Sequence, residues 1–170
     1  MRYFTLLAIG ALLLTGCSGA KETTDKKALP EKMQLGWMQR GDFISPDYPN
    51  FKQSYDTIHI ADNFVEMIKT LHSGIDFVVV LGTWCSDSKR EVPRFLKIVD
   101  GSLIPTGQIR FYGVDRTEKS SDGITDRYNI ERVPTFIFLK HGEEVGRIVE
   151  SPKNSLEEDM LTILADAQDK

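Results

Sequence analysis

The chain has 170 residues, which is enough for one domain with a substantial core and too few for two domains of ordinary size. Its composition, 41% hydrophobic and 27% charged, excludes a wholly disordered chain, and its formal net charge of −4 gives no general attraction for nucleic acid. The three histidines, His59, His72 and His141, have no carboxylates or thiols placed beside them, so we expect neither a metal nor another cofactor.

Residues 1–17 have the pattern of an export signal. Arg2 gives a positive start, and the apolar run 3–14 is too short to span a bilayer comfortably. The run ends in Leu-Thr-Gly-Cys at 14–17, which resembles the lipobox of bacterial lipoproteins, where small residues precede the cysteine that is lipidated. The alternative is an ordinary secretory signal with a chance cysteine.

The lipobox resemblance implies that residues 1–16 are removed and that Cys17 carries a thioether-linked lipid and acyl chains such as palmitate, which together anchor a protein stably. Ser18 follows, and a residue other than Asp here favours the outer membrane in well-studied lipoprotein sorting. We therefore expect a lipid-anchored protein of the cell envelope whose domain faces an extracytoplasmic compartment. Residues 17–32 have the composition of a flexible tether.

The chain has two cysteines, Cys17 and Cys85. With Cys17 lipidated, Cys85 has no internal partner, so the mature protein cannot form an internal disulfide. A lone thiol in an oxidising exported compartment is a liability unless it is buried or useful.

Residues 33–57 contain glycines and prolines among aromatic residues and predict an N-terminal extension, with short helices, that packs on the domain through its aromatics. The domain itself is predicted over residues 58–170. Its first element is a helix from Asp62, a suitable N-cap residue, to His72, and Gly74 suits the position after the last turn.

The apolar run 77–81 has three β-branched residues and predicts a strand buried on both faces. Residues 82–88 turn the chain, and a helix with Pro93 inside it follows to about Val99. The remaining elements are expected to be a strand at 109–114, a loop at 115–121, a short helix at 124–129, strands at 135–139 and 144–149 joined by a hairpin turn, and a helix at 155–167 whose Ser155 and Glu158 fit a capping box. This order predicts the α/β class, with a mixed sheet of four to five strands flanked by helices.

The order of elements, with Trp84-Cys85 at the end of the first core strand, resembles the thioredoxin fold over residues 58–168. Several motifs carry the resemblance: Trp84-Cys85-x-x-Ser88 in place of Trp-Cys-x-x-Cys, Pro93 in the active-site helix, and Val133-Pro134 at the family's cis-proline. The run 82–93 is also similar to a bacterial thioredoxin-like subgroup with Cys-x-Asp-Ser.

Cys85 is expected at a helix N-terminus, where unpaired N–H groups and the helix dipole favour a thiolate. Ser88 lies one turn further on and can donate a hydrogen bond to that thiolate. Lys89 and Arg90 add positive charge nearby, whereas Asp87 opposes it. The expected catalytic residues are therefore Cys85 and Ser88, together with Trp84.

The resemblance implies that Pro134 is cis and lies against Cys85, which leaves the backbone of Val133 to pair with a bound peptide. Trp84, Val133 and Pro134 are accordingly the expected substrate-binding residues. Taken alone, Pro134 is better interpreted as a proline at the start of a strand. Its combination with Trp84-Cys85 favours the family interpretation.

Two departures from the family pattern limit the chemistry. Ser88 replaces the resolving cysteine, and a serine hydroxyl cannot attack a mixed disulfide. Val79 stands where many thioredoxins place the buried acid that accepts the proton of that second thiol. What remains is attack by Cys85, with the mixed disulfide resolved by the partner's own second thiol or by an external thiol.

Three hypotheses remain open. The first is a monothiol disulfide oxidoreductase or isomerase that acts on thiols or disulfides of exported proteins. The second is a non-enzymatic thioredoxin-fold module that binds peptide or protein. The third is another chemistry on the same fold, of which a peroxidase is disfavoured because Thr83 lies two residues before Cys85, whereas those enzymes place Thr three before.

Overall fold

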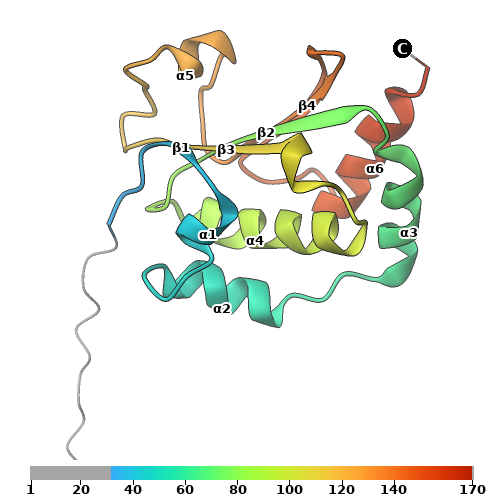
Figure 1. Ribbon diagram of the computed structural model, residues 1–170, viewed down its shortest axis with the longest axis horizontal. Coiled ribbons are helices and arrows are strands. Elements are labelled where there is room, and N and C mark those ends of the chain that lie inside the picture. Colours follow the sequence, from blue (N-terminus) through green and yellow to red (C-terminus); the bar gives the residue numbers. More distant parts are fainter. Residues whose placement is uncertain (1–31, 170) are drawn as a thin grey trace, which may run out of the picture.

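The computed structural model describes residues 32–169. The predicted signal peptide, Cys17, Ser18 and nearly all of the predicted tether lie outside the described residues. A twisted sheet carries most of its helices on one side, and a long irregular connection with a short helix covers part of the other (Figure 1). Within residues 32–169, no helix combines the length and apolar character needed to cross a bilayer.

The described residues form a five-stranded sheet in the order β1-β3-β2-β4-β5. Strands β2 and β3 pair in parallel, and every other pair is antiparallel. This confirms the predicted α/β class and mixed sheet. The strands are β1 (Gly36–Met38), β2 (Ile75–Leu81), β3 (Ile109–Gly113), β4 (Thr135–Lys140) and β5 (Glu143–Val149).

The helices differ little from those predicted. They are α1 (Arg40–Phe43), α2 (Pro49–Thr57), α3 (Asp62–Leu71), α4 (Ser86–Gly101), α5 (Ile124–Arg127) and α6 (Leu156–Asp166). Helix α4 continues through Pro93 to Gly101, two residues beyond the expected end. At α6 the Ser155 hydroxyl accepts the Glu158 amide hydrogen at 3.2 Å, the N-cap bond that the sequence predicts.

The predicted N-cap of α3 is wrong by one residue. Ala61 occupies the cap in an extended conformation, and Asp62 is the first helical residue. An acidic side chain in the first turn still interacts favourably with the helix dipole, which explains why Asp62 suits this end without capping it. Gly74, with φ of +73°, turns the chain towards β2, as its position predicts.

The sequence pattern does not predict strand β1. Its register places Gly36 opposite Gly113 and Met38 opposite Phe111, at the edge of the sheet. The rest of the predicted extension is helical and aromatic, as expected: Phe43 and Phe51 are fully buried, and Phe43 meets Phe111 with ring centroids 5.0 Å apart. The predicted boundary at residue 58 stays a prediction.

The core has two parts, one on each face of the sheet. The larger lies between the sheet and helices α2, α4 and α6, and includes the fully buried phenylalanines Phe43, Phe51, Phe77, Phe95, Phe136 and Phe138. The smaller lies on the opposite face, beneath the connection between β3 and β4, and it includes Cys85 and Val133. Strand β2 is buried on both faces because both parts of the core pack against it.

Candidate active site

Cys85 is the N-cap residue of α4, at the turn that follows β2. Its amide donates to the Gly82 carbonyl at 2.9 Å, which closes the turn. The residue is only 8% exposed, and its sulfur lies 3.2 Å from the Val133 carbonyl oxygen, to which the thiol donates. Cys85 therefore lies where the helix N-terminus favours a thiolate, but its side chain is buried beneath the protein surface.

Ser88 lies one helical turn beyond Cys85 and is fully buried. Its hydroxyl oxygen accepts the amide hydrogen of Gly82 at 3.2 Å. A hydroxyl can accept one hydrogen bond and donate another, so this contact is compatible with donation to a thiolate at Cys85. In the structure, Ser88 braces the turn, a role that the sequence motif does not predict.

Trp84 covers the turn beside Cys85. Its indole N–H donates to the Val114 carbonyl at 2.9 Å, which fixes the ring over Gly82. A Cβ atom on Gly82 would lie 2.7 Å from that ring, so only glycine fits beneath it. The guanidinium of Arg116 lies 4.9 Å from the ring centroid on Trp84. The sequence contains no signal for Arg116, because the fold alone brings the loop after β3 to this turn.

The Val133–Pro134 peptide bond is cis and lies directly against the cysteine. Val133 is 2% exposed, and its carbonyl oxygen is the acceptor for the Cys85 thiol. The sequence leads to the expectation that this backbone is available to a bound peptide. A peptide that pairs with the Val133 carbonyl must therefore replace or share the contact with Cys85.

The charged residues next to the cysteine are paired with one another. Arg90 lies 2.7 Å from both Asp87 and Glu91, and it also donates to Ser151 at 2.8 Å. Its hydrogen bond to Glu91 is the main cause that raises the pKa of Arg90 above its ordinary value, and Asp87 adds to it. The positive charge of Arg90 is thus balanced by two carboxylates instead of being directed at Cys85.

Val79 is fully buried in β2, and its neighbours across the sheet are Phe111 and Phe136. No carboxylate occupies this position beneath the turn. Among residues 32–169, no cluster of three or more His, Cys, Asp or Glu side chains could hold a metal ion. The turn presents the thiol of Cys85 together with hydrogen-bonding neighbours.

The fold and this turn define a class: a thioredoxin-type domain with a cysteine at the start of its active-site helix, a serine one turn on, and a cis-proline against the sulfur. A family model described as thioredoxin matches residues 47–164, well over half of the chain. The protein belongs to the thioredoxin family.

Individual relatives support the family. A thioredoxin of Malassezia sympodialis is 36% identical over 89 residues, covering 50% of this chain and 80% of its own length. A thioredoxin-like protein of Acanthamoeba polyphaga mimivirus is 26% identical over 110 residues, covering 65% and 77%. A solved Pseudomonas aeruginosa protein of unknown function has a TM-score of 0.50 at 17% identity, covering 72% of this chain and 82% of its own, which supports the fold alone. Family membership indicates redox chemistry, with thiols or disulfides as substrates.

Proposed function

We propose that the protein is a membrane-anchored, single-thiol disulfide exchange catalyst that reduces or isomerises disulfides of exported proteins. The observation that carries this proposal is the position of Cys85, at the N-cap of α4 and 3.2 Å from the carbonyl before cis-Pro134. The sequence pattern at 14–17 supports the lipid anchor at Cys17 and the exported location.

The exchange has two steps. The Cys85 thiolate attacks one sulfur of a client disulfide, the client S–S bond breaks, and the other client sulfur leaves as a thiolate. The mixed disulfide is then broken by a second client thiolate, which forms a rearranged client disulfide, or by an external low-molecular-weight thiol. In both cases Cys85 leaves as a thiolate. Ser88 cannot perform the second step, so isomerisation without net oxidation is the reaction favoured here.

A client must first displace the Cys85 thiol from Val133. Cys85 is only 8% exposed, so its sulfur can attack a client disulfide only when the client chain binds beside Trp84 and Pro134. The same burial favours a second candidate, a module that binds peptide at this surface without exchanging disulfides. The two candidates differ in whether the thiol reacts.

A disulfide-scrambled protein substrate separates these candidates. In a buffer with low-molecular-weight thiol, the full chain should accelerate recovery of the native disulfides, Cys85→Ser should abolish the acceleration, and Cys17→Ser should retain it. In a separate, thiol-free buffer, iodoacetamide should modify Cys85, and the modified protein should no longer accelerate recovery. If wild type and Cys85→Ser give equal recovery, the exchange proposal fails and the binding module becomes the favoured candidate.

Cell fractionation tests the proposed lipid anchor at Cys17. Membrane fractions of cells that express the full chain should contain the protein, and Cys17→Ser should move it to the soluble extracytoplasmic fraction. Separation of the outer and inner membranes then tests the expectation from Ser18. A wild-type chain whose mass shows no thioether-linked lipid and no acyl chains at Cys17 would exclude lipid attachment at this residue.

A further inference from the structure

Exposed apolar side chains gather at the start of the described chain. Met33, Leu35 and Trp37 are 44%, 57% and 48% exposed, whereas Met38 beside them is buried. In residues 32–169 only three other large apolar side chains are comparably exposed, and those are scattered along the chain. A water-facing cluster of this kind marks an interaction surface.

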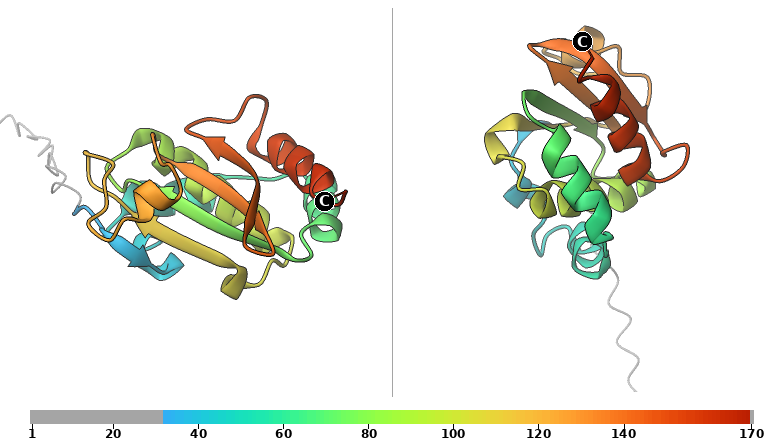
Figure 2. Two further views of the ribbon diagram at one scale, coloured as in Figure 1. Left: turned by 90° about the horizontal axis from the view of Figure 1, so that it is seen from above. Right: turned by 90° about the vertical axis from the view of Figure 1, so that its right-hand side faces the viewer.

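This apolar row is fixed to the turn that carries the cysteine. The amide of Gln34 donates to the Thr83 hydroxyl at 3.1 Å, and that hydroxyl donates to the Lys32 carbonyl at 3.4 Å. Thr83 is fully buried, two residues before Cys85. Figure 1 shows the start of the described chain beside the turn between β2 and α4, and the view from above in Figure 2 agrees.

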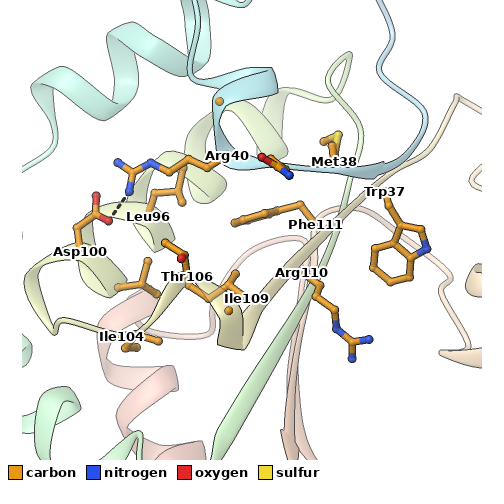
Figure 3. A pocket seen from close by; sticks show the side chains of 14 residues that line it. Trp37, Met38, Arg40, Leu96, Asp100, Ile104, Thr106, Ile109, Arg110 and Phe111 are labelled. Carbon is orange, nitrogen blue, oxygen red and sulfur yellow. Dashed lines mark hydrogen bonds and ion pairs between the residues drawn. The ribbon is translucent and has the colours of Figure 1, made fainter.

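Trp37 is also held in place. Its ring packs edge-on against Tyr112 with centroids 5.1 Å apart, and the guanidinium of Arg110 lies 5.7 Å from the Trp37 centroid. Figure 3 shows Trp37 and Arg110 side by side at the rim of a cavity of about 650 Å³, away from the Arg40–Asp100 ion pair at its other end. An indole beside a cation suits the headgroup region of a lipid bilayer.

We infer that Met33, Leu35, Trp37 and Arg110 form a surface that docks on the headgroup region of the membrane to which Cys17 anchors the chain. The inference rests on the lipid anchor of the proposed function. Residues 18–31 separate Cys17 from Lys32, so even a fully extended connection spans no more than about 50 Å. The tether therefore keeps the membrane within reach of this row at a high effective concentration.

The charges fit an anionic lipid surface. Arg110 and Lys32 are exposed cations beside the row, although the whole chain carries a formal net charge of −4. The apolar side chains and these cations then hold one end of an otherwise acidic protein to the bilayer. Because Thr83 links the row to the Cys85 turn, docking directs the thiol towards disulfides close to the membrane surface.

Tryptophan fluorescence tests the docking. The chain has two tryptophans, so Trp84→Phe leaves Trp37 as the reporter and Trp37→Phe leaves Trp84. The full lipidated chain is reconstituted in phosphatidylethanolamine–phosphatidylglycerol vesicles with ordinary or brominated acyl chains. We expect brominated chains to quench Trp37 and to leave Trp84 unchanged. Leu35→Ser should weaken the quenching, whereas Leu103→Ser, at a residue 68% exposed beyond the end of α4, should not.

Failure of the docking can be distinguished from failure of the lipid anchor and from failure of disulfide exchange. A chain that floats with the vesicles while Trp37 stays unquenched overturns the docking and leaves the anchor intact. A concentration-dependent dimer that Leu35→Ser dissociates, with Trp37 unquenched, assigns the row to a second copy and also overturns docking. A chain that does not float with the vesicles would contradict both the lipid anchor and the docking. Disulfide exchange by Cys85 is measured separately, on the wild-type chain with a soluble substrate, and is independent of all three outcomes.

Discussion

The Ser88 hydroxyl oxygen accepts the amide hydrogen of Gly82 at 3.2 Å, so the residue that replaces the second cysteine of the family motif supports the turn that carries the first. Both residues are buried, which makes the bond hard to replace with water. The serine therefore has a structural role whatever its part in the chemistry.

Replacement of this hydroxyl should destabilise the fold. Ser88→Ala leaves the buried Gly82 amide without its acceptor, and we expect the free energy of unfolding to fall by about 1–3 kcal/mol. Urea denaturation followed by circular dichroism measures the change. Ser86→Ala, at an exposed position in the same turn of α4, is the matched control and should have little effect. Equal stabilities for the two variants would contradict the bracing role.

Ser88→Cys should create dithiol chemistry. The new thiol would lie one helical turn from Cys85, the spacing of the family motif, so it could attack a mixed disulfide and release the client as a dithiol. We expect insulin reduction in the presence of dithiothreitol to rise well above that of wild type. The double variant Cys85→Ser/Ser88→Cys controls for the added thiol. Activity in the double variant equal to that in Ser88→Cys would assign the reduction to the new thiol alone.

A methyl group on Gly82 should disturb the site. The added Cβ would lie 2.7 Å from the Trp84 ring, which is fixed by its bond to Val114, so the ring must move. We expect Gly82→Ala to lower the free energy of unfolding by about 1–3 kcal/mol and to change Trp84 fluorescence in a Trp37→Phe background. Gly107→Ala is the control, because nothing lies within 4 Å of the position that its methyl group would take. Unaltered Trp84 emission in Gly82→Ala would contradict the close packing.

The pair Tyr112–Asp122 predicts an acid-dependent contribution to stability. The Tyr112 hydroxyl donates to Asp122 at 2.6 Å, and this bond is the main cause that lowers the pKa of Asp122 below its ordinary value. A lowered pKa in the folded state means that the contribution is present above about pH 4, where the unfolded carboxyl is ionised, and is lost as the pH falls further.

Tyr112→Phe should remove this contribution and keep the ring. Unfolding measured across the acid range should show a stability difference between wild type and variant at pH 7 that shrinks below about pH 4. Tyr128→Phe, which also lies on the smaller side of the core, should give a difference that does not depend on pH in this range. A constant difference for Tyr112→Phe would mean that the hydrogen bond does not distinguish the two states of Asp122.

The strands and helices of the core could be predicted because their patterns are local. β2 contains the continuous apolar run 77–81, and α4 follows a turn and carries an apolar face. β1 could not be predicted in this way, since a three-residue strand with a glycine and an exposed tryptophan is defined by its partner β3, which lies far along the chain.

The same distinction applies to the site. The motif around Trp84, Cys85 and Ser88 is contiguous, and Val133-Pro134 is a short signature. Both sets of site residues could therefore be predicted from the sequence. The structure brings these residues together at one turn. The contacts of Thr83 with residues 32–34, of Arg116 with the Trp84 ring, and of Arg90 with Ser151 are all long-range. A pattern in one chain contains no local signal for contacts of that kind.

Strand β1 has a practical consequence for any shortened form of the protein. The family match begins at residue 47, but the strand that pairs with the outer edge of β3 ends at Met38. A chain that starts at residue 47 would leave that edge unpaired and would deprive the buried Thr83 hydroxyl of its contacts with Lys32 and Gln34. Open strand edges recruit other chains, so such a fragment would aggregate, although it contains every residue of the recognisable motif.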